Sequence, residues 1–592
     1  TGTAASASDA LGHDIHSGGV GLAPGTSVDF DIFWSDTYSD LRTENYLSYA
    51  PSRDVIPTMA YGWYLTSRDT LTGMAKRLED QGKRVVGGIN GGYYSFSTGA
   101  PDGIVISDGV LRSAPSADSA SGSGGWYWGI GFQEDGSAFI GQPKISIRAT
   151  FHGAAHSVTG GLNKVRGETN GYVLLNSDFA TTTQNTSPGV DVILTPVTTN
   201  VGQTVAREDG IQLTQSDAPT VMGRMSFTVD KVQDSSSAIA IPAGKYLLTV
   251  NNKSGAASTS ALKALSPGDT VDIDFTSPDS RWADAVEATG APSRLVKDGA
   301  VDSASFSGDS NAKTRRARTA IGIKPDGTVL FYTIDGEQSG YSVGCTLQQV
   351  AMRLIELGCT EAVALDGGGS TTLGATYPGQ STLGVVNKPS GGSQRSNSTA
   401  LFLTTTLSAT GTLGSYYVKP SDAMVLSGSS VQLSATPLDT AYYPMTSSEP
   451  VDWYIQNGDG IVTADGLFTA GSESGTTQVT AASGKASGTT TMTVVKTPQT
   501  ITVSNAATGK TVTSLDAAPK QQVDLKASAT YRKLALVSQD TSYTWTCTPA
   551  VGPIDPNGVF TAASSPASGS ITVSAGGKSI SIPVSIAGHT RG

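Results

Sequence analysis

The chain has 592 residues, of which 38% are hydrophobic and 15% are charged, with 70 glycines and a net charge of −11. This length allows several domains, and the low charge content suits strands and turns better than long surface helices. The acidic balance, without a basic block, argues against nucleic acid and anionic membranes as partners. No apolar stretch approaches the roughly 18–20 residues that a membrane helix needs, which argues against membrane insertion.

The first informative segment is the apolar stretch 84–89, "RVVGGI", which predicts a strand and is followed by Asn90, Gly91 and Gly92. These three residues have two interpretations. They form a turn after the strand, or they bring bare backbone close to a ligand.

Residues 318–373 carry the densest pattern. The stretches 319–323 and 328–334 read as strands joined by the turn "KPDG", which places Arg318 opposite the region of Ile334 and Asp335. Thr346 is an expected N-cap of an amphipathic helix over 347–357, and "EAVAL" (361–365) is a short apolar strand. Strand, helix and strand predict a βαβ unit with two parallel strands, and hence an α+β catalytic domain with a mixed sheet.

Both strands of that unit end in Asp-Gly, at Asp335 and Asp366, and three consecutive glycines follow Asp366. Because parallel strands present their carboxyl ends at one edge, both carboxylates and Arg318 are expected to meet there. The glycines would let an anionic or sugar ligand reach backbone N–H groups. Asp-Gly is also ordinary turn chemistry, so a structural role remains the alternative for each aspartate alone.

Two other catalytic patterns are weak. "GYSVG" matches Gly-x-Ser-x-Gly, with Ser342 at its centre, but a loop separates this serine from the preceding strand, and the acid and histidine that should follow it are poorly placed. The histidines show no metal-ligand spacing, so no cofactor is expected. Clustered aspartates leave a divalent cation such as calcium as an alternative.

The last ~180 residues form a tandem repeat. Trp453 and Trp545 are separated by the same 92 positions as Phe468 and Phe560, and each copy has alternating strands with Gly, Asn and Asp turns. Such spacing predicts antiparallel β-sandwiches. The copies resemble bacterial immunoglobulin-like domains of cell-surface and secreted proteins. The expected domains are therefore 1–408, 409–496 and 497–592. The low charge and the C-terminal organisation predict a secreted or cell-surface protein, and a secreted protein with only three cysteines fits a Gram-positive bacterium.

Over about residues 25–406 the chain resembles the phosphodiester glycosidase family, which includes the lysosomal uncapping enzyme of animals. The motifs that carry this resemblance are "INGGYY" (89–94), "PDGIVISDG" (101–109), "ARTAIG" (317–322), "IDG" (334–336), "GYSVG" (340–344), "LDGGGSTT" (365–372) and "NKPSGGSQRSNSTAL" (387–401).

The resemblance implies an exo-acting hydrolase that splits the anomeric C–O bond of a sugar-1-phosphate diester and releases free sugar and a phosphomonoester. Three carboxylates are the catalytic candidates, namely Asp366, Asp335 and Glu337. The residues expected to bind substrate are Asn90, Gly91, Gly92, Arg318, Gly367, Gly368, Gly369, Ser370 and Arg395. The expected partner is a phosphate-containing glycan or glycoconjugate, with a possible cell-wall or surface association through the C-terminal domains.

Three positions depart from the family pattern, namely Glu337, Gln349 and Ala364. They leave the sugar open and keep a second interpretation in play, a cell-surface carbohydrate-binding or adhesion protein with a retained but inactive pocket. A phosphodiesterase that cuts on the phosphorus side is a weaker alternative, because no His/Asp motif for a two-metal site is present.

Overall fold

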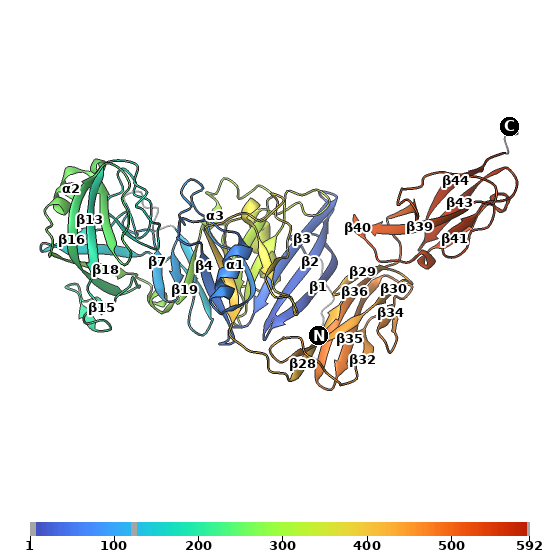
Figure 1. Ribbon diagram of the computed structural model, residues 1–592, viewed down its shortest axis with the longest axis horizontal. Coiled ribbons are helices and arrows are strands. Elements are labelled where there is room, and N and C mark those ends of the chain that lie inside the picture. Colours follow the sequence, from blue (N-terminus) through green and yellow to red (C-terminus); the bar gives the residue numbers. More distant parts are fainter. Residues whose placement is uncertain (1–7, 120–126, 589–592) are drawn as a thin grey trace.

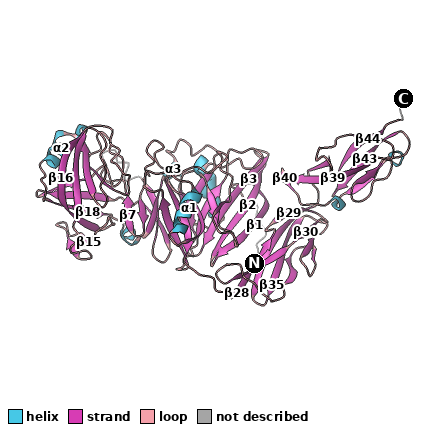
Figure 2. Cartoon of the chain, viewed as in Figure 1, coloured by secondary structure: helices cyan, strands magenta, loops and turns pink. Residues whose placement is uncertain are grey.

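The computed structural model describes residues 8–119 and 127–588, and 47% of the chain is strand and 9% helix (Figure 2). The α-helices of the described residues are α1 (Leu71–Asp80), α2 (Ala256–Lys263), α3 (Ser303–Phe306) and α4 (Leu347–Glu356). The prediction of an α+β catalytic domain is therefore wrong, since the fold is nearly all β. None of the helices in the described ranges has the length and apolar character to span a membrane.

An eight-stranded sheet forms the centre of the front part of the molecule, which we define as β1 to β27 (Figure 1). Every neighbouring pair in it is antiparallel. In spatial order its strands are β1 (His13–Ala23), β2 (Thr26–Ser35), β3 (Asp40–Tyr49), β23 (Val329–Ile334), β22 (Arg318–Ile323), β24 (Glu361–Ala364), β20 (Ser293–Lys297) and β21 (Ala300–Val301).

The expected βαβ unit is absent from this sheet. β23 and β24 flank α4 in sequence, but they do not pair, because β22 lies between them and is antiparallel to both. The tight turn after β22 seats it beside β23, which fills the edge that a parallel partner would need. The chain leaving α4 therefore adds β24 to the free edge of β22.

The two faces of the central sheet are covered differently. One face packs on α4, whose Val350 and Leu354 meet Ala320 and Tyr332 of the sheet in one buried cluster. The other face shares a core with two five-stranded sheets. Their strands, in spatial order, are β26 (Gly384–Val385), β25 (Leu373–Ala375), β5 (Arg84–Asn90), β27 (Thr399–Thr405) and β4 (Val55–Tyr61), and β7 (Val110–Ser113), β6 (Val105–Ser107), β19 (Glu287–Ala291), β8 (Trp128–Phe132) and β9 (Ala138–Gly141).

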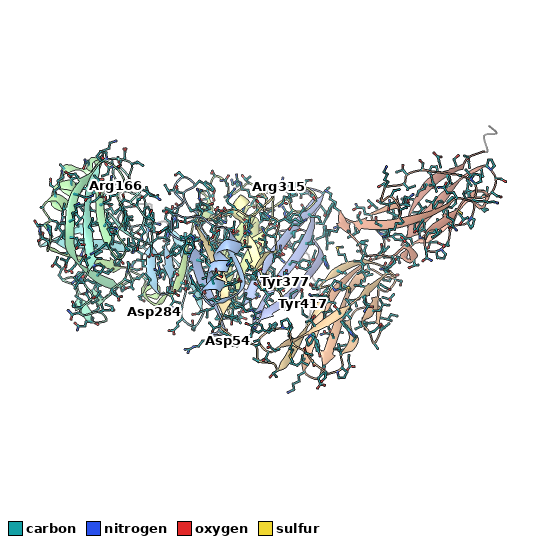
Figure 3. All side chains as sticks on the ribbon, in the orientation of Figure 1. Asp54, Arg166, Asp284, Arg315, Tyr377 and Tyr417 are labelled. Atoms are coloured by element: carbon teal, nitrogen blue, oxygen red, sulfur yellow. The ribbon has the colours of Figure 1, made fainter. Side chains whose placement is uncertain are left out.

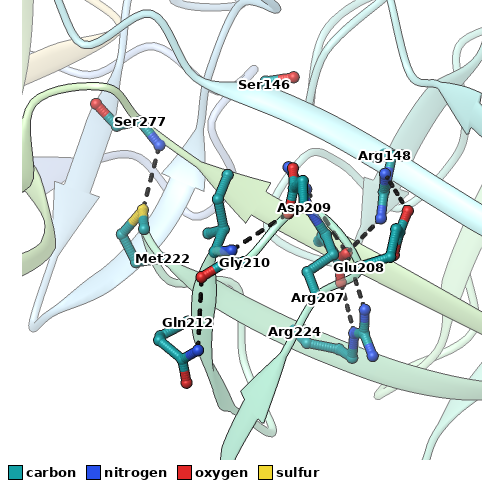
Figure 4. A network of polar contacts seen from close by, with 12 residues as sticks. Ser146, Arg148, Arg207, Glu208, Asp209, Gly210, Gln212, Met222, Arg224 and Ser277 are labelled. Carbon is teal, nitrogen blue, oxygen red and sulfur yellow. Dashed lines mark hydrogen bonds and ion pairs between the residues drawn. The ribbon is translucent and has the colours of Figure 1, made fainter.

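A nine-stranded sheet with α2 lies at the end of the molecule opposite the C-terminus (Figure 1). Its strands are β10 (Ser146–Phe151), β11 (Ala154–Ser157), β12 (Val173–Asn176), β13 (Gly189–Pro196), β14 (Thr204–Ala206), β15 (Gln212–Gln215), β16 (Gly223–Ser235), β17 (Tyr246–Asn251) and β18 (Thr270–Thr276). Asp274, on β18, is buried and accepts two hydrogen bonds from Arg224, while Arg148 and Arg207 lie within 4 Å of its carboxylate. This network ties the β14–β15 hairpin to the sheet (Figure 4).

Two all-β units follow, which we call the first tail unit (β28 to β36) and the second tail unit (β37 to β44). The strands of the first are β28 (Leu413–Lys419), β29 (Ala423–Leu426), β30 (Ser430–Gln432), β31 (Ser434–Asp439), β32 (Asp452–Asn457), β33 (Ile461–Val462), β34 (Leu467–Thr469), β35 (Gly475–Ser483) and β36 (Ala486–Val495). Those of the second are β37 (Thr500–Asn505), β38 (Leu515–Ala517), β39 (Gln522–Tyr531), β40 (Leu534–Ala535), β41 (Thr544–Cys547), β42 (Val559–Thr561), β43 (Ala567–Ala575) and β44 (Lys578–Ile586).

The sequence repeat corresponds to the same side-chain packing in both tail units. Phe468 and Phe560 are both fully buried. Gly466 and Gly558 both have positive φ, and a Cβ at either would press on the tryptophan of the same unit, Trp453 or Trp545. At both positions glycine therefore allows a left-handed turn that packs closely against the tryptophan ring. The immunoglobulin-like identity of the two units stays a prediction.

Candidate active site

One end of the central sheet brings the predicted groups together. Arg318, the first residue of β22, pairs with Ile334, the last residue of β23, and Ala364 at the end of β24 pairs with Ala320. A cleft of about 710 Å³ opens beside this edge. Its charged side chains are Asp102, Asp309, Glu337, Asp366, Arg316, Arg318 and Arg395, and its aromatic ones are Tyr93, Tyr94 and Phe96.

Asp366 lines the cleft directly after the strand that precedes the glycines. Its backbone is fixed on both sides, because its N–H donates to the Gly91 carbonyl at 3.1 Å and its own carbonyl accepts from Asn90 Nδ2 at 2.7 Å. Burial raises the pKa of its carboxyl to about 6, although the Ser370 hydroxyl and the positive charge of Arg395 act in the opposite direction. The group can therefore change its protonation state near neutral pH.

A different structural feature favours glycine at each of the three positions after Asp366. Gly367 packs on the neighbouring strand, where a Cβ would lie 2.6 Å from the Ala317 carbonyl oxygen. Gly368 has φ +61°, and a Cβ on Gly369 would lie 2.3 Å from Nη2 of Arg395. The run thus lets the chain turn sharply while a guanidinium rests against bare backbone. All three glycines line the cleft.

Arg318 is buried against carbonyl groups rather than against a carboxylate. Its Nε donates to the Cys345 carbonyl at 3.0 Å, and its Nη2 donates to the carbonyls of Asn311 and Thr314 at 2.7 and 2.6 Å. Nη1 makes no hydrogen bond with any residue that the structure describes. Among the described residues no ion pair joins Arg318 to a carboxylate, although the charge of Asp309 acts on its pKa, and the guanidinium lines the cleft, where an anion could contact it.

Two further arginines complete a cationic side of the cleft. Nη1 of Arg395 donates to Ser370 Oγ at 3.2 Å, and its guanidinium lies 5.4 Å from the centre of the Phe96 ring. Arg316 also lines the cleft, and its Nε is buried with no hydrogen-bond partner among the described residues. An unpartnered buried donor costs free energy, which an anionic ligand bound in the cleft would recover in part.

Asp335, the second predicted carboxylate, does not line the cleft. Only 1% of its surface is exposed. Its Oδ1 accepts from Asn387 Nδ2 at 2.8 Å, and its Oδ2 accepts from the Tyr341 hydroxyl at 2.7 Å and from the Lys388 N–H at 3.0 Å. Burial raises its pKa, but its geometry is that of a group that fastens two loops to the end of β23. Glu337, two residues later, does line the cleft and is exposed.

Asn90, Gly91 and Gly92 lie beneath the cleft rather than in it. Asn90 is 1% exposed, and its Oδ1 accepts from Thr319 Oγ1 at 2.9 Å and from the Thr372 N–H at 3.1 Å. Together with its contact to the Asp366 carbonyl, this makes Asn90 a positioning residue. Ser370 is likewise buried, and its hydroxyl meets Arg395 from below.

Sequence reasoning missed Asp102, Asp309, Arg316, Tyr93 and Phe96 as lining residues. Tyr93 and Asp102 fall inside the motifs "INGGYY" and "PDGIVISDG", and Arg316 lies two positions before Arg318, the first residue of β22. Asp309 precedes the strand in a region without a motif. Phe96 is 63% exposed, a large value for an aromatic side chain beside a polar cleft.

The departures from the family pattern differ in position. Gln349 closes a capping box at the start of α4, where its Oε1 accepts from the Thr346 N–H at 2.9 Å, and Ala364 is buried in β24. Only Glu337 lies in the cleft. Ser342 is fully buried, donates to the Asp335 carbonyl at 2.6 Å and accepts from the Thr43 N–H at 3.0 Å, so it has the contacts of a structural serine.

Within residues 8–119 and 127–588, no three His, Cys, Asp or Glu side chains are placed to hold a metal ion.

Part of the chain matches a family model. Residues 220–404 match the family model described as phosphodiester glycosidase. This stretch includes Arg316, Arg318, Glu337, Asp366 and Arg395, whereas Tyr93, Phe96 and Asp102 lie outside it. No curated protein matches the chain.

Solved structures to which the chain is similar include the following three. A hypothetical protein from Synechocystis is 17% identical, with 65% of this chain and 63% of that chain covered and a TM-score of 0.49. A putative exported protein from Burkholderia pseudomallei is 22% identical, with 62% and 74% covered and a TM-score of 0.44. The catalytic domain of zebrafish N-acetylglucosamine-1-phosphodiester alpha-N-acetylglucosaminidase, auto-inhibited by its pro-peptide, is 15% identical, with 66% and 88% covered and a TM-score of 0.31. The chain thus spans less than two thirds of the Synechocystis protein, and function must be argued from the site.

Proposed function

We propose that the protein is an exo-acting phosphodiester glycosidase that hydrolyses sugar-1-phosphate diesters. Water forms a new bond to the anomeric carbon, the anomeric C–O bond breaks, and the products are free sugar and a phosphomonoester. One observation carries this proposal. A single cleft holds a largely buried carboxyl group with a pKa of about 6, that of Asp366, beside three arginines.

The roles of the carboxylate and the arginines follow from the chemistry of the substrate. A phosphodiester leaves easily, so the leaving group needs little help from a general acid. The enzyme must instead stabilise a sugar ring that becomes cationic as the C–O bond breaks. Ionised Asp366 supplies the negative charge for that ring. Arg316, Arg318 and Arg395 hold the phosphate, which gains a second negative charge as the C–O bond breaks.

The aromatic side chains fit the sugar. Phe96 and Tyr93 line the same cleft as Asp366, and both present part of their ring surface to solvent. Sugar rings stack on aromatic faces because their C–H groups form an apolar surface. Asp102, Asp309 and Glu337 offer carboxylate oxygens to sugar hydroxyls around them.

The wider setting is part of the same proposal. We infer a catalytic domain over 1–408 and two immunoglobulin-like domains over 409–496 and 497–592 that place it at a cell surface or cell wall. A phosphate-linked glycan or glycoconjugate outside the cell would be the substrate.

The test is product analysis on a panel of diesters of N-acetylglucosamine, galactose, glucose and mannose 1-phosphate. We expect wild type to release free sugar and phosphomonoester from at least one of them, and Asp366→Asn to lose this activity. Lys485→Ala, in an exposed turn of the first tail unit, serves as the matched control and should keep it. Binding of a panel member without turnover would instead support the carbohydrate-recognition alternative.

A further inference from the structure

The tail units are fastened to the front part along its edge strand β1. The Gly19 N–H donates to Asp422 Oδ2 at 2.9 Å, and His16 Nδ1 lies 2.8 Å from Thr493 Oγ1. On the same side, Tyr377 of the front part and Tyr417 of the first tail unit lie near each other (Figure 3). These contacts fix the tail against the front part, so a force or contact on the tail can reach the sheet.

The second tail unit reaches the front part with the tip of one hairpin. β39 and β40 are joined by two residues, Arg532 and Lys533, with Tyr531 paired to Leu534. Both tip residues are left-handed, with φ of 45° and 68°. Two-residue hairpins of this kind strongly prefer Asn-Gly, because a left-handed conformation is unfavourable for residues with long side chains. Such a conformation persists where other contacts compensate for it.

The compensating contacts are with the front part. Lys533 Nζ lies 3.2 Å from Oδ1 of Asp40 at the start of β3. The guanidinium of Arg532 lies 5.3 Å and the ammonium of Lys533 lies 5.9 Å from the ring centre of Trp34 on β2. Both cations therefore contact one small patch, formed by Trp34 and Asp40. The ribbon shows the hairpin end at β40 near the end of the central sheet at β3 (Figure 1).

Asp40 is also the anchor of a loop that reaches the cleft. Both of its carboxylate oxygens accept the Gly340 N–H at 3.1 Å, and Oδ1 also accepts the Leu41 N–H at 2.8 Å. Gly340 belongs to the loop 336–341, which carries Glu337 into the cleft with φ of 60°. One buried carboxylate thus joins the tail hairpin to a lining loop of the candidate active site.

We propose that the hairpin tip Arg532–Lys533 is a brace that sets the loop 336–341 through Asp40, which makes Lys533 and Asp40 positioning residues for the cleft. The tail is then part of the working enzyme rather than only a spacer. Its effect on turnover rests on the proposed function, whereas its effect on the loop does not.

Hydrogen exchange of the full chain tests the brace without any substrate. In Lys533→Ala the Gly340 amide should exchange about threefold faster, the effect expected for losing one partly exposed ion pair. Lys533→Arg should restore wild-type exchange, and Lys526→Ala, an exposed lysine on the same hairpin, should leave it unchanged. Glycine suits the left-handed position, so Lys533→Gly should keep or raise the stability of the tail unit and still speed exchange at Gly340.

Wild-type exchange at Gly340 in both Lys533→Ala and Lys533→Gly would overturn the brace. The kinetic readout is kcat and KM on the diester panel, where Lys533→Gly should lower kcat/KM by about threefold and Lys533→Arg should restore it. If exchange follows Lys533 while wild type turns over no diester, the brace stands and the proposed function fails. If diesters are hydrolysed and neither exchange nor kcat/KM follows Lys533, the proposed function stands and the brace fails.

Discussion

Replacing Asp366 by asparagine should inactivate the protein and stabilise it at the same time. The folded protein holds this carboxyl group at a pKa of about 6 instead of 3.8, mainly because burial disfavours its charged form. At 1.36 kcal/mol per pKa unit, the ionised group costs about 3 kcal/mol of stability at pH 7. Asparagine removes that cost but offers one acceptor oxygen fewer, so the expected net gain is about 1–3 kcal/mol.

The sign of the pH dependence follows from the raised pKa. Below pH 3.8 the carboxyl is protonated in the folded and unfolded chains, so it costs nothing. The cost grows between pH 3.8 and 6 and is complete above 6. Thermal unfolding should therefore show Asp366→Asn above wild type by about 2–6 °C at pH 7 and nearly equal to it at pH 4.

Asp335→Asn is the matched control, because the same change is made in the other Asp-Gly motif. Both of its oxygens accept hydrogen bonds, and an amide nitrogen in place of one oxygen would face a donor. We expect Asp335→Asn to lower the free energy of unfolding by about 1–3 kcal/mol, opposite in sign to the effect of Asp366→Asn.

Turnover should fall at least ~100-fold in Asp366→Asn. A destabilised or fully active Asp366→Asn would refute this reasoning.

Three further outcomes are expected. The kcat/KM of wild type should rise with pH through a pKa of about 6, since ionised Asp366 is the active form. In Arg395→Gln the pKa that governs this rise should be higher by about half a pH unit, as a pH–rate profile would show. Gly369→Ala should raise KM for the diester and leave the melting temperature within about 1 °C, because the added Cβ meets only the mobile end of Arg395; an unchanged KM would contradict the role of that guanidinium. Ser342→Ala should lose about 1–2 kcal/mol of stability in thermal unfolding but retain turnover, and loss of turnover in a folded protein would revive the serine-nucleophile alternative.

The sequence predicted which residues meet at the edge of the cleft better than the fold around it. The turn "KPDG" determines that Arg318 lies opposite Ile334, and Asp366 with its three glycines is a local signal that survives any sheet order. Strand order is not local. The position of β22 between β23 and β24 depends on which edge strand of the sheet is unpaired when the chain leaves α4. The spacing of residues in the sequence carries no information about that strand order.

The sequence also did not predict the direction in which each candidate side chain points. Asp335 and Asp366 follow equivalent strand ends, yet Asp335 turns to Asn387 and Lys388 in a loop 52 residues away, whereas Asp366 faces the cleft. Asn90 had the motif of a binding residue but holds the Asp366 peptide from beneath.

The central claim is that the anomeric C–O bond, not a P–O bond, is broken. Hydrolysis of an accepted diester in water labelled with heavy oxygen tests this directly, because the oxygen of water enters the fragment whose bond it attacks. We predict that mass spectrometry will find the label in the free sugar and none in the phosphomonoester. Label in the phosphate product would contradict the glycosidase mechanism and would indicate attack at phosphorus.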